Sequence, residues 1–114
     1  MLNKYVVLTI GIFLLNNVLI WYQLNSQLVW DWAKGAKSMW IMSLMGIPIS
    51  LLFWYATKWG YIGFGNLWAV RFLGFATSMI TFPIMTYFYL GDTITLKTLI
   101  TILLAIIIMI LQLL

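Results

Sequence analysis

Long apolar segments, separated by short polar stretches, account for most of this 114-residue chain. Each segment has roughly 20 residues or more, and a helix of that length, rising about 1.5 Å per residue, crosses a bilayer core of ~30 Å. The pattern therefore predicts four membrane-spanning helices, over residues 5–24, 38–57, 64–90 and 94–114. Because their connections are short, we expect an all-α, up-down four-helix bundle, built as a single transmembrane domain over residues 1–114.

The first connection, residues 25–37, mixes polar residues with tryptophans. Trp30, Trp32 and Trp40 lie within it or just beyond it, near the predicted ends of two spans. Tryptophan is enriched where a membrane meets water, so these three residues predict an interfacial aromatic belt. A tryptophan cage around a cationic ligand is the alternative interpretation.

Glycines mark the two remaining connections. We expect one tight turn over residues 58–63, Lys-Trp-Gly-Tyr-Ile-Gly, and a second over residues 91–93, Gly-Asp-Thr. Thr93 is predicted to cap the last helix, and the Asp92 carboxylate would favour the positively polarised N-terminus of that helix. Turns this short can join only antiparallel neighbours, which fits the up-down order.

Composition supports a membrane protein and argues against several activities. The chain is 65% hydrophobic and 7% charged, with a mean hydropathy of +1.08, whereas soluble domains carry about 25% charged residues. We expect an integral, multi-pass protein of a bacterial-type inner membrane, with the lipid bilayer as its first partner. Cysteine and histidine are absent, so we predict no metal site, no cofactor and no enzymatic activity. The six basic residues are dispersed, which argues against a nucleic-acid partner.

A few polar residues fall inside the predicted spans. Asn16 and Asn17 lie a little past the middle of the first span, and Arg71 lies in the third. Because Arg71, Ser78 and Thr81 share one helical stripe, the five residues together predict a polar cleft. The alternatives are a hydrogen bond between helices for the amides and close helix packing for the stripe.

Arg71 needs a partner, because a guanidinium that faces lipid costs ~2 kcal/mol or more. The C-terminal carboxylate of Leu114 or a lipid phosphate would serve structurally. Neighbouring amides, a bound anion or Asp92 of an inverted second copy are the further candidates.

Two prolines interrupt otherwise apolar spans. Pro48 lies near the centre of the second span, and Pro83 lies in the third, which is longer than a bilayer requires. Proline removes a backbone donor and clashes with the carbonyl four residues earlier, so both positions are candidate hinges.

Three short motifs carry a likeness to a known family: Ala56-Thr57-Lys58, Gly60-Tyr61-Ile62-Gly63 and Tyr89-Leu90-Gly91-Asp92. An almost purely aliphatic last span follows them. In this order and spacing, residues 47–112 resemble the drug/metabolite transporter superfamily, particularly its small four-helix members, the small multidrug resistance proteins. The resemblance implies the four-helix fold and a transporter-like function. Leu14 stands where that family carries a first-span glutamate, which argues against proton-coupled export of cations.

Two functions from different classes remain open at this stage. The first is a small transporter-like protein that works as a homodimer or larger assembly, with its cleft at the second and third spans. The second is a non-catalytic structural or accessory subunit, which packs its aliphatic surfaces and tryptophans against partner proteins, lipids or pigments. The missing first-span carboxylate makes a neutral or anionic substrate the better expectation for a transporter.

Overall fold

The computed structural model describes residues 3–114, and every element in that range is helical. The order is α1 (Lys4–Val29), the one-turn 3₁₀ helix η1 (Asp31–Ala33), α2 (Ala36–Leu44), α3 (Gly46–Phe64), α4 (Leu67–Leu90) and α5 (Leu96–Leu113). Since α2 and α3 together form one long rod, four helices are long and apolar enough to cross a membrane. This suggests a multi-pass membrane protein.

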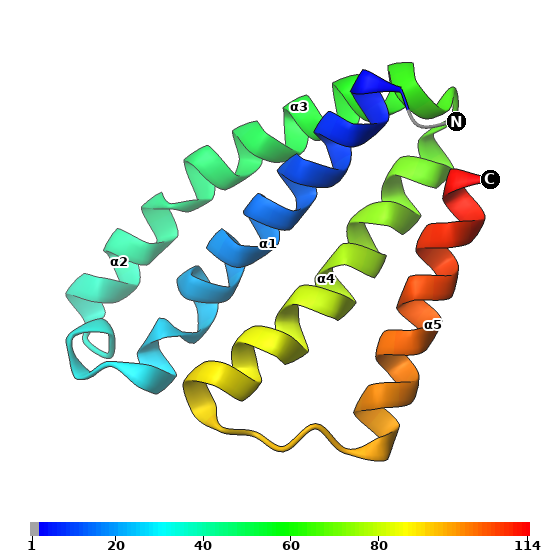
Figure 1. Cartoon of the computed structure of the whole chain (residues 1–114). Coiled ribbons are helices and arrows are strands. Elements are labelled where there is room, and N and C mark those ends of the chain that lie inside the picture. Colours follow the sequence, from blue (N-terminus) through cyan, green and yellow to red (C-terminus); the bar gives the residue numbers. More distant parts are fainter. Residues whose placement is uncertain (1–2) are drawn as a thin grey trace.

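The helices lie side by side in the order α3, α1, α4, α5 (Figure 1). Helices α1, α3 and α4 contact one another, whereas α5 lies at one edge, on α4 alone, in the described chain. The arrangement is therefore an open layer, without the central core shared by four helices that a closed bundle would have.

The chain runs up and down, as expected. The start of α1, the end of α5 and the turn between α3 and α4 lie at one end of the layer, which we call the terminal end (Figure 1). The link from α1 to α2 and the link from α4 to α5 lie at the other, which we call the linker end.

The predicted turn over 58–63 is wrong, because α3 continues through it to Phe64. The chain reverses instead at Gly65, whose φ of 80° suits glycine, and at Asn66, whose side chain accepts a hydrogen bond from the Ala69 N–H at 2.8 Å. The glycines of the motif serve close packing: a Cβ on Gly60 would lie 2.9 Å from a Val70 methyl.

Two other boundaries also differ. The first helix extends to Val29, so residues 25–29 of the predicted 25–37 connection are helical. The predicted cap at Thr93 is wrong, because the N-cap of α5 is Thr95, whose side chain accepts from the Thr98 N–H at 3.2 Å. The Thr98 hydroxyl lies 3.1 Å from the Thr95 hydroxyl, and this second contact favours the later start. Asp92 and Thr93 belong to the exposed link between α4 and α5.

The two prolines lie in different settings. Pro48 is in the first turn of α3, just after the helical rod is interrupted at Met45. Pro48 has no N–H to donate to the Leu44 carbonyl, and the loss of this helical hydrogen bond accounts for the interruption. Pro83 lies within α4, which continues through it to Leu90.

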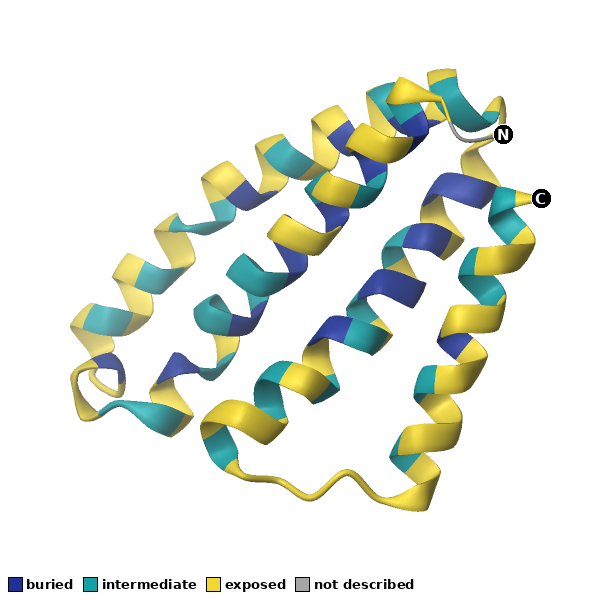
Figure 2. Cartoon of the chain, in the orientation of Figure 1, coloured by how far each residue is buried: buried dark blue, intermediate teal, exposed yellow. Residues whose placement is uncertain are grey.

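The buried residues gather where α1, α3 and α4 meet. Phe13, Ala56, Val70 and Leu73 form a hydrophobic cluster there. Figure 2 shows buried positions along the facing sides of α1 and α4, whereas α5 is exposed over most of its surface. Ala105 is the buried residue of α5, at the contact with α4.

Candidate binding groove between α1, α3 and α4

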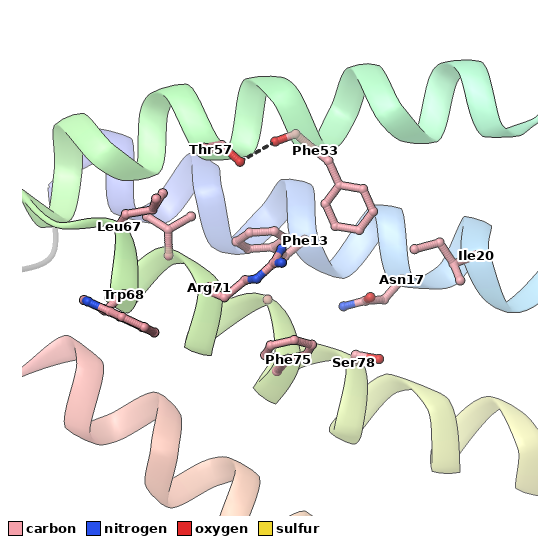
Figure 3. A pocket seen from close by; sticks show the side chains of 12 residues that line it. Phe13, Asn17, Ile20, Phe53, Thr57, Leu67, Trp68, Arg71, Phe75 and Ser78 are labelled. Atoms are coloured by element: carbon pink, nitrogen blue, oxygen red, sulfur yellow. Dashed lines mark hydrogen bonds between the residues drawn. The ribbon is translucent and has the colours of Figure 1, made fainter.

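A groove of about 780 Å³ lies beside the hydrophobic cluster (Figure 3). Its size falls within the range of about 300–1,000 Å³ that is typical of small-molecule sites. Helix α1 provides its floor, and α3 and α4 provide its walls. The lining side chains are Phe13, Asn17, Ile20, Phe53, Thr57, Leu67, Trp68, Val70, Arg71, Gly74, Phe75 and Ser78.

The α4 wall follows from helical spacing. Arg71, Gly74 and Ser78 lie at positions i, i+3 and i+7, which fall on one side of a helix. The bare surface of Gly74 receives the Phe13 ring from α1, because a Cβ there would lie 3.2 Å from Phe13 Cε1. The groove is open along one side, since Trp68 at the end of the wall is 72% exposed and Phe75 is 55% exposed.

Arg71 is the charged residue of this groove. It is the fifth residue of α4, about 6 Å along the axis from the helix start. Its side chain extends across the groove toward Phe13 (Figure 3), and Cζ lies 5.5 Å from the centroid of the Phe75 ring. This distance is that of a cation–π contact, which leaves the guanidinium N–H groups available.

No acidic group pairs with Arg71 in the part of the chain that the structure describes. The ion pair found there joins Lys34 to Asp31 at 3.2 Å, at the linker end. The expected structural partner, the C-terminal carboxylate of Leu114, does not make a salt bridge to Arg71. A lipid phosphate, a bound anion and Asp92 of a second copy therefore stay predictions.

The two asparagines point to different neighbours. Asn17 donates from Nδ2 to Thr77 Oγ1 at 2.9 Å, which links α1 to α4 and leaves the Asn17 amide oxygen without a partner in residues 3–114. Asn16 donates to the Ile49 carbonyl of α3 at 3.3 Å, and its own amide oxygen is buried without a partner. Hydrogen bonds between helices therefore account for the Nδ2 group of each asparagine.

Three of the five residues predicted for the polar cleft line the groove, namely Asn17, Arg71 and Ser78. Asn16 does not, because adjacent helical residues point about 100° apart and it faces α3. Thr81 does not either, since it is buried one turn beyond Ser78.

Sequence reasoning missed the aromatic part of the lining. Phe13 comes four residues before Asn17, and Phe75 comes four residues after Arg71, so each shares a helix face with a polar residue that was identified. This spacing was the available signal for both. No comparable signal marked Phe53 of α3, which meets Phe13 with ring centroids 6.2 Å apart.

The three tryptophans of the predicted belt, Trp30, Trp32 and Trp40, do not lie together in the structure. Trp30 and Trp32 stack at the linker end with ring centroids 6.0 Å apart, and Trp30 also stacks on Tyr22 at 6.2 Å. Tyr89 of α4 joins this cluster, 5.6 Å from Trp30. Because the rings pack against one another, they form a stack without the open centre of a cation cage. Trp40 lies apart from them on α2 and is 69% exposed.

The groove offers a ligand one cationic side chain, amide and hydroxyl groups, and aromatic surface. Within residues 3–114, no group of three His, Cys, Asp or Glu side chains could hold a metal ion. Comparisons with protein-family models, curated proteins and solved structures give no match to this chain.

Proposed function

We propose that this protein is a small transporter-like membrane protein that binds a solute in the groove between α1, α3 and α4 and moves it across a bacterial-type inner membrane. The observation that carries the proposal is an open groove of about 780 Å³, set among helices long enough to span a bilayer and containing an arginine without an acidic partner in residues 3–114.

A bilayer around the four helices would explain their apolar exterior. In α5, Leu103, Ile107 and Ile110 are all exposed, and in water such a surface would be an aggregation hazard. The 18 residues of α5 span about 27 Å, close to the thickness of a bilayer core. Both aspartates lie in links at one end, where lipid headgroups and water would solvate them.

The open layer also supports a homodimer or a larger assembly of this chain. A second copy could cover the groove on its open side, which a single copy leaves uncovered. Bending at Pro48 and Pro83 would then expose the covered groove to one side of the membrane at a time. The interruption of the helical rod at Met45, three residues before Pro48, supports a hinge there.

Transport is tested with the purified protein in liposomes and a panel of labelled neutral, anionic and cationic metabolites. We expect protein-dependent uptake of at least one class, and we expect Ser78→Trp, which fills the groove, to abolish it. Met79→Trp is the matched control, because Met79 is adjacent in α4 and does not line the groove. No uptake of any compound, or equal uptake by both variants, would count against the proposal.

Cysteine accessibility tests the arrangement across the membrane, because the chain contains no cysteine of its own. Lys34→Cys and Asp92→Cys lie in links at the linker end, and Lys4→Cys lies at the terminal end. An impermeant maleimide should label the first two from the same side and the third from the opposite side. Labelling of all three from one side only would refute the membrane-spanning arrangement.

An accessory subunit is the second candidate, and the nearly bare α5 favours it, since partner proteins could pack on this helix. Gentle solubilisation followed by native mass measurement separates the two functions. A homodimer supports the transporter, whereas a defined complex that contains other chains supports the accessory subunit.

A further inference from the structure

The groove has a polar group near each end and aromatic rings between them. We propose that its ligand is a small aromatic carboxylate, with the carboxylate at Arg71, the ring among Phe13, Phe53 and Phe75, and a second polar group near Asn17. This inference rests on the proposed function, since it names the substrate class of the same site.

The charge of the groove selects an anion. Arg71 is its charged lining residue, and no acidic partner reaches that arginine in residues 3–114. A guanidinium presents parallel N–H donors that match the two oxygens of a carboxylate. A cation would instead meet uncompensated repulsion, which is strong where the surroundings are apolar.

Aromatic side chains select the body of the ligand. The rings of Phe13 and Phe53 lie 6.2 Å apart and are inclined at 56°, on the floor and one wall of the groove. On the opposite wall, Phe75 lies below the guanidinium (Figure 3). Aromatic rings attract one another at centroid separations of about 4.5–7 Å, so rings on the floor and on both walls favour a planar aromatic ligand.

The deep end of the groove selects a second polar group. Asn17 donates its Nδ2 hydrogen to Thr77 Oγ1, and its amide oxygen has no partner among residues 3–114, so it can accept a hydrogen bond from a ligand. Ser78 lines the same end, seven residues and therefore about 10 Å along α4 from Arg71. Because the Arg71 side chain reaches into the groove, a ligand hydroxyl on the far side of the ring from the carboxylate would satisfy both side chains.

A membrane phospholipid is the competing source of an anionic headgroup. Its phosphate could reach Arg71, but its acyl chain would bring only carbon atoms against Asn17 and Ser78. Leaving a buried polar group without a partner is unfavourable, so the polar deep end favours the aromatic carboxylate over an acyl chain.

The experiment measures equilibrium binding of labelled 4-hydroxyphenylacetate to the full chain in phosphatidylcholine nanodiscs. The competitors are phenylacetate, which lacks the hydroxyl, and 4-hydroxyphenylacetamide, which lacks the charge. We expect 4-hydroxyphenylacetamide to bind at least about tenfold more weakly than 4-hydroxyphenylacetate, and phenylacetate to bind several-fold more weakly. The loss is larger for the amide because a hydrogen bond to a charged group is stronger than one between neutral groups. This comparison uses only the wild-type protein, so it does not depend on whether a variant folds.

Variants then locate the charge. Arg71→Gln should bind the acid and the amide with similar affinity, and Arg71→Lys should keep part of the preference for the acid. Lys97→Gln is the control: it removes the same charge from an exposed position on α5, outside the groove, and should bind as the wild type does.

Three results would overturn the inference: equal binding of acid and amide by the wild type, an unchanged preference in Arg71→Gln, or retention of phosphatidylglycerol in place of the carboxylate. The last would identify a lipid site, detected by native mass spectrometry. Carboxylate binding without flux in liposomes would support this inference and refute transport. Flux of uncharged or cationic compounds without carboxylate binding would refute this inference and leave transport standing.

Discussion

Gly60 lies in α3 at the point where three helices meet, and its replacement by alanine tests the packing directly. A Cβ there would lie 2.9 Å and 3.1 Å from the two methyl carbons of Val70 in α4, and 3.1 Å from Thr9 Cγ2 in α1. Val70 and Thr9 are both buried and β-branched, so neither can rotate away cheaply within a helix. The helices themselves would have to move apart.

Gly11→Ala provides the reference for this change. Gly11 is also helical, but a Cβ on it would meet nothing within 4 Å. Both substitutions gain the same helix propensity, about 1 kcal/mol, which cancels when the two variants are compared. The difference that remains is the overpacking cost at Gly60, ~1–3 kcal/mol. Gly11→Ala should therefore equal or exceed the wild type in stability, and Gly60→Ala should be less stable than Gly11→Ala by that amount.

The free energy of unfolding is measured by titrating the protein in mixed micelles with dodecyl sulfate and following helix content by circular dichroism. Adding Val70→Ala to Gly60→Ala removes the methyl groups that clash, so the two changes should couple favourably in a double-mutant cycle. If Gly60→Ala were as stable as Gly11→Ala, the three helices would not be in the close contact described, and the floor of the groove would be misplaced.

Two further predictions concern single hydrogen bonds. In a double-mutant cycle, Asn17→Leu and Thr77→Val should show a coupling energy of about 0.5–1.5 kcal/mol for unfolding in micelles, because the two side chains bond at 2.9 Å; a coupling near zero would contradict that bond. Thr95→Ala should lower stability by about 1 kcal/mol through loss of the α5 cap, whereas Thr93→Ala, in the exposed link, should change it by less than about 0.5 kcal/mol; equal effects would contradict the assigned cap.

Helical pattern and composition were enough to predict the four long apolar helices and their up-down order. Each is a local property, since a helix satisfies its own backbone and needs only enough apolar length to cross a bilayer. The shared helical face of Arg71 and Ser78 could also be predicted, because residues on one helix keep a fixed angular relation whatever packs against them.

Which neighbouring helix each face contacts became clear only from the packed structure. The pair of amides at Asn16 and Asn17 looked like one polar feature, but α1 lies between two helices, so the first faces α3 and the second faces α4. The glycines at 60 and 63 are equally suited to a turn or to close helix contact by local criteria, and only the neighbouring Val6 and Val70 show that they serve contact.

The groove itself is the clearest case. Phe13, Phe53 and Arg71 come from three helices that are far apart in sequence, and no local rule relates their positions. The residue pattern is enough to predict how many apolar helices form and which residues share a face, because helix geometry is set within a few residues. The relative positions of those faces depend on side-chain fit between helices, and only the packed structure contains that information.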